Sequence, residues 1–314
     1  MSTTAARGDG RMRFGVNLLN FGPGAGPESL RTWAGVAEGL GYDALLISDH
    51  VAVTPDVADQ YPAPLYEPLT ALAYLAAVTE RIHLGTTVLI VPYRHPLLTA
   101  KVTANIDQLS GGRLVLGVGV GWARQEYDAL GVPFARRGDL TDEYLTVLKA
   151  LWTRDVVSHD GAFVRFAGVQ SGPRPVARPH PPLWVGGWSG AAKRRAVRLG
   201  DAWHPLGGTL RAFGDGMEGL RAVAESEQRP VPAFVPRINL RLSGVAQGED
   251  RLAGEGTVDQ VRQDLAALRD MGAESVVFDT YLGASAEQDQ HRLAWSLLER
   301  LADEVIDLGT GTVR

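Results

Sequence analysis

The chain of 314 residues is predicted to have an α/β fold, a single (β/α)8 TIM barrel with insertions after its second and fourth strands. Short and almost wholly apolar segments alternate eight times with amphipathic ones. This is the pattern of parallel strands buried on both faces and of the helices that cover them. Glycine-rich or polar clusters follow several of the apolar segments, at the strand ends where barrels bind ligands.

The elements of the barrel are expected in a regular order. The strands are expected at residues 13–18, 42–47, 82–89, 113–117, 183–186, 201–204, 233–245 and 275–279. The helices are expected at 29–40, 69–79, 97–109, 139–152, 191–199, 211–228, 257–271 and 288–308. Gly41 is a typical glycine after a helix C-terminus, and the apolar residues from Leu140 to Leu151 recur at helical spacing.

Two segments interrupt this alternation. The Pro-rich stretch 53–68 is long for a connection, which favours a functional loop over the barrel mouth. Residues 156–182 are predicted to be an insertion between two barrel units, with a small hairpin at 157–166 around Asp160-Gly161 and a Pro-rich tail. Residues 1–11 are small and polar and are expected to form a disordered tail, so the barrel domain spans 12–314.

The composition limits the classes of partner. Hydrophobic residues make up 45% and charged residues 21%, as in an ordinary globular protein with a large core. The net charge of −5 argues against a nucleic-acid surface. The absence of cysteine excludes disulfides and Cys-ligated metals and fits a reducing cytoplasm. Neither a signal peptide nor an apolar run long enough for a membrane span is found, so we expect a cytoplasmic protein.

The stretch from Gly111 to Gly131 is the most informative part of the chain. A buried strand leads into Gly117, Gly119, Gly121 and Trp122. Glycines at the end of a strand let a ligand approach the backbone closely, because no Cβ is in the way. A tight turn alone would need fewer glycines, so we interpret the segment, with Val120 between the glycines, as a pocket floor.

A second glycine cluster, Gly186-Gly187-Trp188-Ser189-Gly190, ends a strand and opens a helix. The exposed N–H groups of a helix N-terminus favour an anion, so the cluster is a candidate phosphate site. Ser189 either supplies a hydroxyl to the ligand or caps the helix. Trp122 and Trp188 either wall a planar aromatic ligand or pack into the core.

Asp49 and His50 end the second strand, and a histidine at this end of a barrel is a candidate catalytic residue. Asp49 either orients His50 or caps the following loop. His95 and His204 are weaker candidates. The sequence shows no metal-binding histidine spacing, no GxSxG nucleophile elbow and no dinucleotide fingerprint in its proper context, so no metal is expected.

These residues together resemble the bacterial luciferase-like flavin oxidoreductases, from Arg13 to about Leu301. The matching segments are RFGV, GYD leading to Ser48-Asp49-His50, TERIHLGT, DQLSGGR running into GVGVGW, and LWVGG followed by LGDAW. The resemblance implies a TIM barrel that binds a flavin or the deazaflavin F420 at the C-terminal ends of the strands. It also implies a homodimer.

The resemblance further assigns individual residues to the cofactor. The ring would lie near Asp49, His50, Thr87 and Val88, with a non-proline cis peptide at Thr87-Val88 behind it. Gly119, Val120 and Gly121 would line the side of the ring, and Gly186, Gly187, Trp188 and Ser189 would hold the phosphate. Trp122 stands where the sugar-phosphate dehydrogenase branch has a glutamate, which argues against that activity. Glu126, the nearest acid, resembles an acid of other branches for which a structural role is plausible.

Three functions follow from the resemblance. The first is an F420-dependent oxidoreductase that transfers a hydride between the cofactor and a mid-sized organic substrate, with His50 in proton transfer or orientation. The second is a monooxygenase that uses O2 and FMNH2 delivered by a separate flavin reductase, with His50 and the loop 53–68 keeping water from the flavin. The third is a non-catalytic flavin-binding protein. The substrate is expected to meet an apolar, aromatic mouth with Asn17, Asn239 and Arg237 as polar contacts.

Overall fold

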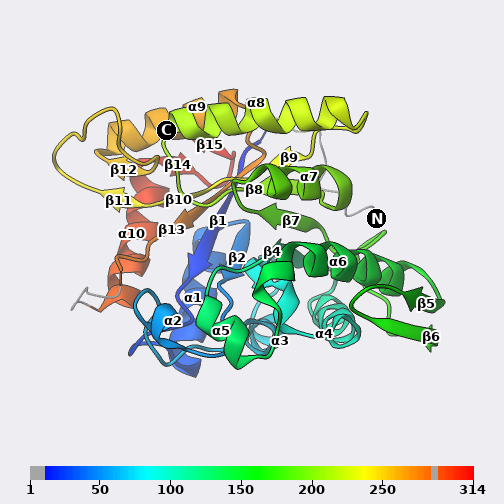
Figure 1. Cartoon of the computed structure of the whole chain (residues 1–314). Coiled ribbons are helices and arrows are strands. Elements are labelled where there is room, and N and C mark those ends of the chain that lie inside the picture. Colours follow the sequence, from blue (N-terminus) through cyan, green and yellow to red (C-terminus); the bar gives the residue numbers. More distant parts are fainter. Residues whose placement is uncertain (1–10, 284–288) are drawn as a thin grey trace.

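The computed structural model describes residues 11–283 and 289–314 and shows a parallel β-barrel wrapped by helices (Figure 1). The main sheet has nine strands in the order β10-β13-β1-β2-β3-β4-β7-β8-β9. In chain order these are β1 (Arg13–Leu18), β2 (Ala44–Ile47), β3 (His83–Ile90), β4 (Leu114–Gly119), β7 (Leu183–Gly186), β8 (Ala202–His204), β9 (Ala233–Phe234), β10 (Arg237–Asn239) and β13 (Ser275–Asp279). The predicted fold class is confirmed.

The barrel closes through two short strands where the sequence predicts one seventh strand at 233–245. β9 pairs with β8, and β10 pairs with β13. The break falls at Pro236, which has no N–H to donate to a ladder. The remainder of the predicted strand leaves the barrel: β11 (Arg241–Leu242) pairs with β12 (Glu255–Gly256) in a separate sheet. The prediction of one continuous strand was therefore wrong.

Eight helices follow the barrel strands and cover the outside of the sheet (Figure 1). They are α1 (Pro27–Leu40), α3 (Pro68–Val78), α4 (Pro96–Leu109), α6 (Arg137–Thr153), α7 (Gly190–Leu199), α8 (Leu210–Ser226), α9 (Val258–Asp270) and α10 (Gln290–Glu304). Gly41 ends α1 with φ 94°, as its predicted capping position requires. None of the helices in the described residues is long and apolar enough to cross a membrane.

The last helix is shorter than predicted. It ends at Glu304, and β14 (Ile306–Asp307) then pairs with β15 (Thr312–Val313). The Asp307 carboxylate accepts hydrogen bonds from the N–H groups of Gly309 and Thr310, which fixes the turn. Arg11, the one described residue of the predicted tail, donates to the carbonyl of Leu308 beside this hairpin. Residues 1–10 and Gln288 lie outside the described residues.

Both predicted interruptions are present as extra structure around the barrel. The loop after β2 carries the short helix α2 (Pro55–Ala58), and α5 (Arg124–Ala129) follows β4. Between α6 and β7, the strands β5 (Val156–Asp160) and β6 (Arg165–Gln170) form an antiparallel hairpin. Its turn is residues 161–164, longer than the predicted Asp160-Gly161 turn, because the Glu143 carboxylate holds the N–H groups of Ala162, Phe163 and Val164.

A bulge in β3 shapes the C-terminal end of the barrel. β3 pairs with β4 in register up to Thr86, and pairing resumes only at Leu89, so Thr87 and Val88 stand out of the ladder. The peptide bond between them is cis, as the family resemblance implied. The Val88 methyl groups project against Gly119 of β4 and Gly186 of β7. A Cβ on Gly119 would lie 2.6 Å from Val88 Cγ2, and one on Gly186 would lie 3.0 Å from Cγ1.

The three glycines at positions 117, 119 and 121 are therefore needed for the packing of the strands as well as for the pocket. Gly117 and Gly119 lie within β4 and not after it, which corrects the predicted strand end at residue 117. A Cβ on Gly117 would lie 2.0 Å from the Thr86 carbonyl oxygen. Gly121 follows the strand with φ 70°, a conformation that other residues rarely adopt. Close approach of β3 to its neighbours requires glycine at these positions.

We predict that Gly119→Ala lowers the free energy of unfolding by about 1–3 kcal/mol, because its methyl group overlaps Val88. Urea denaturation measures the change. Val88→Ala in the same chain should recover much of the loss, since it removes the overlapping methyl groups. The control is Gly214→Ala in α8, where no atom lies within 4 Å of the added Cβ. Equal losses in both glycine variants would contradict the proposed close packing.

Candidate active site

A cavity of about 340 Å³ opens at the C-terminal ends of the barrel strands. Its volume lies within the range of small-molecule and cofactor sites. The strand ends bring together every predicted site residue except Ser189, along with several that were not predicted. The lining is Ser48, Asp49, His50, Tyr61, Thr87, Val88, Ile90, Gly119, Val120, Gly121, Trp122, Gly186, Gly187, Trp188, His204, Leu206 and Arg237. The sequence therefore located the cavity.

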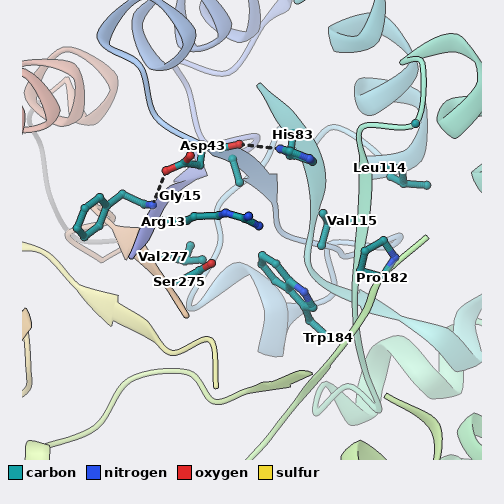
Figure 2. Close-up of a pocket in the computed structure, with 13 residues that line it drawn as sticks. Arg13, Gly15, Asp43, His83, Leu114, Val115, Pro182, Trp184, Ser275 and Val277 are labelled. Atoms are coloured by element: carbon teal, nitrogen blue, oxygen red, sulfur yellow. Dashed lines mark hydrogen bonds between the residues drawn. The ribbon is translucent and has the colours of Figure 1, made fainter. Parts of the chain in front are cut away.

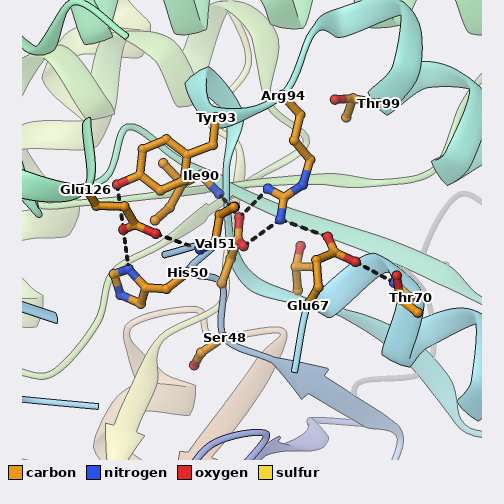
Figure 3. Close-up of polar contacts among 12 residues, drawn as sticks. Ser48, His50, Val51, Glu67, Thr70, Ile90, Tyr93, Arg94, Thr99 and Glu126 are labelled. Atoms are coloured by element: carbon orange, nitrogen blue, oxygen red, sulfur yellow. Dashed lines mark hydrogen bonds and ion pairs between the residues drawn. The ribbon is translucent and has the colours of Figure 1, made fainter. Parts of the chain in front are cut away.

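His50 is held by Glu126 and not by Asp49 (Figure 3). The His50 Nδ1 atom lies 2.6 Å from Glu126 Oε2, and both side chains are buried. The Tyr93 hydroxyl donates to the same oxygen over 2.9 Å, and the N–H groups of Val51 and Ala52 donate to Oε1. Because a carboxylate only accepts hydrogen bonds, Nδ1 carries a proton. Nε2 is therefore the ring nitrogen left to meet a ligand in the cavity.

The negative charge of the buried Glu126 carboxylate is stabilised by the hydrogen bonds that it accepts. Burial would raise the pKa of its carboxyl, but the hydrogen bonds from His50 and from the N–H groups of Ala52 and Val51 outweigh burial and lower the pKa below its ordinary value. Burial, and after it the same carboxylate, raises the pKa of Tyr93. Glu126 is thus an anion that fixes the orientation of His50. The sequence suggested only a structural role for this residue, and its pairing with His50 was missed.

Asp49 has a different set of partners on the far side of the same strand end (Figure 3). Its two oxygens receive the two terminal nitrogens of Arg94 at 2.7 and 2.8 Å, and Oδ2 also accepts the N–H of Ile90. Arg94 continues to Glu67, which caps α3 through the N–H of Thr70. The bidentate ion pair ties the end of β2 to the segment after β3. Neither predicted alternative, orientation of His50 or capping of the following loop, describes this arrangement.

A buried polar network lies under the bulge. His204 Nδ1 is 2.6 Å from the Val235 carbonyl oxygen, so it donates, and Nε2 accepts from the Thr87 hydroxyl at 2.8 Å. Burial lowers the pKa of His204 to about 4, which keeps the ring neutral at pH 7. Arg237 donates to the Thr87 carbonyl and pairs with Asp279 at 2.6 Å. The network fixes the position of Thr87 through contacts on the interior side of the barrel.

Arg237 and Asn17 therefore lie in the barrel interior, and of the two only Arg237 also lines the cavity. Asn17 donates to Asp279 and accepts from Ser48, and it does not line the cavity. Burial would raise the pKa of Asp279, but Arg237 outweighs burial and lowers it. Arg237 lines the cavity from below. Among the predicted polar contacts of a substrate, Arg237 is the one that the cavity includes.

Trp122 and Trp188 differ in whether they wall the cavity or pack into the core, the two alternatives that the sequence left open. Trp122 is 42% exposed and packs edge-on against His50 at a ring distance of 5.6 Å, so it walls the cavity beside the imidazole. Trp188 lines the cavity too, but its ring packs on Trp203 and Phe213, and its indole N–H donates to the Leu206 carbonyl. Trp188 is thus partly a packing residue.

The second glycine cluster forms the start of α7 as predicted. Ser189 is the N-cap, and its hydroxyl oxygen accepts the N–H of Ala192. The first N–H groups of the helix, those of Gly190 and Ala191, have no partner within the helix and remain available to an anion. Gly187 has φ 107° and lies at the cavity edge. The structure confirms the capping role of Ser189, and the phosphate role stays a prediction.

Comparison with known proteins shows the family of the chain. The family model of the luciferase-like monooxygenases matches residues 12–243. An uncharacterised protein of Mycobacterium tuberculosis is 31% identical over 252 residues, which cover 72% of this chain and 87% of the relative. The FMNH2-dependent dimethylsulfone monooxygenase of Pseudomonas putida is 33% identical over 169 residues, 53% of this chain and 46% of that protein.

Among solved structures, an F420-dependent secondary alcohol dehydrogenase superimposes with a TM-score of 0.72. Its sequence identity is 15%, and the match covers 86% of this chain and 93% of that one. At this identity the likeness shows the fold. The family match and the curated relative, rather than the fold alone, make the chain an oxidoreductase of the flavin- or deazaflavin-dependent class. The chain belongs to the luciferase-like monooxygenase family.

We predict that Glu126→Gln changes how stability depends on pH. The pKa of Glu126 is lower in the folded protein than in the unfolded chain. The ionised carboxylate therefore stabilises the fold fully at pH values above its ordinary pKa of 4.5, and this stabilisation is lost as the pH falls below 4.5. The unfolding free energy of the variant should therefore approach that of the wild type between pH 6 and about pH 3. A constant difference across this range would contradict the assignment. Glu225→Gln, on an exposed site of α8, is the control.

Proposed function

We propose that the protein is an F420-dependent oxidoreductase that transfers a hydride between the deazaflavin and a mid-sized organic substrate. The observation that carries the proposal is the placement of His50. Glu126 holds its imidazole by Nδ1, and His50 lines the same cavity as Thr87 and Val88, the residues implied to back the cofactor. A fixed imidazole next to a flat binding surface suits hydride transfer coupled to proton transfer.

The residues present fit a flavin-type cofactor. Gly119 and Gly186 make room for the methyl groups of Val88, which lines the cavity, so a planar ring can lie against the apolar surface of the bulge. The available N–H groups at the start of α7 suit the phosphate end of the cofactor. When bound, the deazaflavin supplies or accepts the hydride, while the protein positions the reactants.

The remaining roles follow from the contacts. His50 Nε2 would hold or move the proton at the reacting centre, and Glu126 would keep the ring in that orientation and stabilise its charged form. Asp49 is buried and fully engaged with Arg94 and Ile90, so we assign it a positioning role in place of the predicted catalytic one. Tyr61 and Trp122 would enclose an apolar part of the substrate.

The open mouth of the cavity favours hydride transfer over oxygen activation. Trp122 and Leu206, which line the cavity, are 42% and 45% exposed. A flavin that activates O2 has to be shielded from water, whereas hydride transfer from a deazaflavin has no such requirement. The second candidate, an FMNH2-dependent monooxygenase supplied by a separate reductase, is supported by the 33% identity to the dimethylsulfone monooxygenase.

The deciding experiment is a binding titration of the cofactor-free protein with oxidised F420 and, in parallel, with FMN. We expect F420 to bind in the micromolar range or tighter, and at least tenfold more tightly than FMN. Reduced F420 should then be oxidised anaerobically by reducible organic substrates such as aldehydes, ketones, imines or alkenes. Preference for FMN, with O2 consumption that depends on a flavin reductase, would overturn the proposal in favour of the second candidate.

We predict that His50→Gln lowers kcat by 10²–10⁴-fold and changes the cofactor Kd by less than threefold, because general acid–base catalysis contributes about that much to rate. Stopped-flow oxidation of reduced F420 and a cofactor titration measure the two quantities. Asp49→Asn is the matched comparison and should lower the unfolding free energy by about 3–5 kcal/mol, because it breaks a buried ion pair. Equal losses of binding and turnover in the His50 variant would mean that His50 only shapes the cavity.

A further inference from the structure

Tyr61 lies in the loop between α2 and α3 and lines the cavity of the candidate active site. Its ring is 5.4 Å from that of His50, with 34° between the two ring planes. Tyr281 stacks on the Tyr61 ring at 5.8 Å, and Phe21 packs edge-on against it at 5.0 Å. Aromatic contacts from the segments after β1 and β13 therefore hold the ring of Tyr61 next to the imidazole.

Hydrogen bonds fix the backbone on both sides of Tyr61. The Tyr281 hydroxyl donates to the Gln60 carbonyl oxygen at 2.6 Å, and the N–H of Gly22 donates to the Pro62 carbonyl oxygen at 2.9 Å. A side chain on a backbone held in this way is already in place when a ligand arrives. Binding to it then costs little ordering entropy.

The Tyr61 hydroxyl is free to meet a ligand. Among the described residues it has no hydrogen-bond partner, although Tyr61 lines the cavity. The other two hydroxyl groups of the described lining are engaged, since that of Ser48 donates to Asn17 and that of Thr87 donates to His204. A ligand can therefore bind the Tyr61 hydroxyl without breaking a hydrogen bond of the protein.

The cavity offers this hydroxyl as a neutral donor. Burial raises the pKa of Tyr61 above its ordinary value and outweighs the lowering by Arg237, so the phenol keeps its proton at neutral pH. Asp49 and Arg237, the Asp and Arg residues of the described lining, are each paired, with Arg94 and with Asp279. A carboxylate would find no free guanidinium there, whereas a neutral oxygen would find a donor.

The barrel interior separates this cavity from the N-terminal ends of the strands. The hollow there encloses only about 80 Å³, and Figure 2 shows the Trp184 ring within it. It shares no lining residue with the candidate active site, and Trp184 packs against His204 of that site at a ring distance of 5.5 Å. A ligand from the mouth thus meets Trp122 and the half-buried Tyr61 before it reaches the buried His50.

We propose that Tyr61 is a substrate-binding residue whose hydroxyl donates a hydrogen bond to the carbonyl or alcohol oxygen of a neutral aromatic substrate. The rings of Tyr61 and Trp122 suit the aromatic body of such a molecule. A donor fixed at a carbonyl oxygen would also stabilise the negative charge that develops there during hydride transfer to the carbonyl carbon. The proposal rests on the proposed function and narrows its substrate class.

The test uses two probes of matched shape, acetophenone and α-methylstyrene, in which a methylene group replaces the carbonyl oxygen. Each is titrated into wild-type and Tyr61→Phe protein loaded with oxidised F420 and, separately, with FMN. We expect Tyr61→Phe to lower the ratio of acetophenone affinity to α-methylstyrene affinity by about 3–10-fold, the effect of one neutral hydrogen bond. The affinity for α-methylstyrene should change less than twofold. Because the hydroxyl has no partner in the described protein, the urea midpoint of the variant should equal that of the wild type.

Tyr281→Phe is the matched control, since it removes a hydroxyl from the adjoining ring of the same cluster. That hydroxyl donates to Gln60, and Tyr281 does not line the cavity, so the affinity ratio should stay within about twofold. A ratio that is unchanged in Tyr61→Phe, or that falls equally in Tyr281→Phe, would overturn the proposal. A fall in Trp122→Phe alone would assign the contact to the indole N–H and overturn it as well.

Failure of this proposal differs from failure of the proposed function. If F420 does not bind, the proposed function is wrong, and the protein loaded with FMN still reports on Tyr61. If F420 binds tightly but Tyr61→Phe leaves the affinity ratio unchanged, the role of Tyr61 alone is wrong. Absence of saturable binding of both probes would overturn the assignment of a neutral aromatic substrate.

Discussion

The close approach of the β3 bulge to its two neighbours is the constraint on which the upper end of this barrel depends. Val88 fills the space over Gly119 and Gly186, and no Cβ would fit at Gly117 beside the Thr86 carbonyl. The glycines thus have two effects. They allow the strands to pack around an irregular β3, and they make room for Val88, whose methyl groups give the cavity an apolar wall where a planar ring can lie.

Two carboxylates fix the strand ends around this bulge in different ways. Asp49 binds Arg94 and ties the end of β2 to the segment after β3, while Glu126 reaches back from α5 to His50. The two consecutive residues Asp49 and His50, which follow β2, therefore have separate roles. Asp49 ties two segments of the scaffold together, and His50 presents an imidazole nitrogen to the cavity. Below them, Thr87 is fixed on the interior side of the barrel by Arg237, which pairs with Asp279, and by His204. The polar interior here is a support for the site, since its groups are nearly all paired.

Much of this architecture could be predicted from the sequence because local patterns encode it. Apolar runs such as 13–18, 183–186 and 275–279 matched the observed strands at both ends. Glycines and polar residues at strand ends located the cavity. The break in the predicted seventh strand is not evident from the sequence, because the apolar residues before Pro236 and the alternating residues after it together resemble one strand. The His50–Glu126 contact was missed because it joins residues 76 positions apart, and no local pattern reports such a pairing.

The account is tested most directly by a crystal structure of the protein with oxidised F420 bound. It predicts that the deazaflavin ring lies against Thr87 and Val88, that His50 Nε2 faces the reacting edge of the ring, and that the phosphate meets the N–H groups at the start of α7. A ring bound away from the bulge, or a phosphate distant from α7, would contradict the central claim that the glycine-lined end of this barrel is its cofactor site.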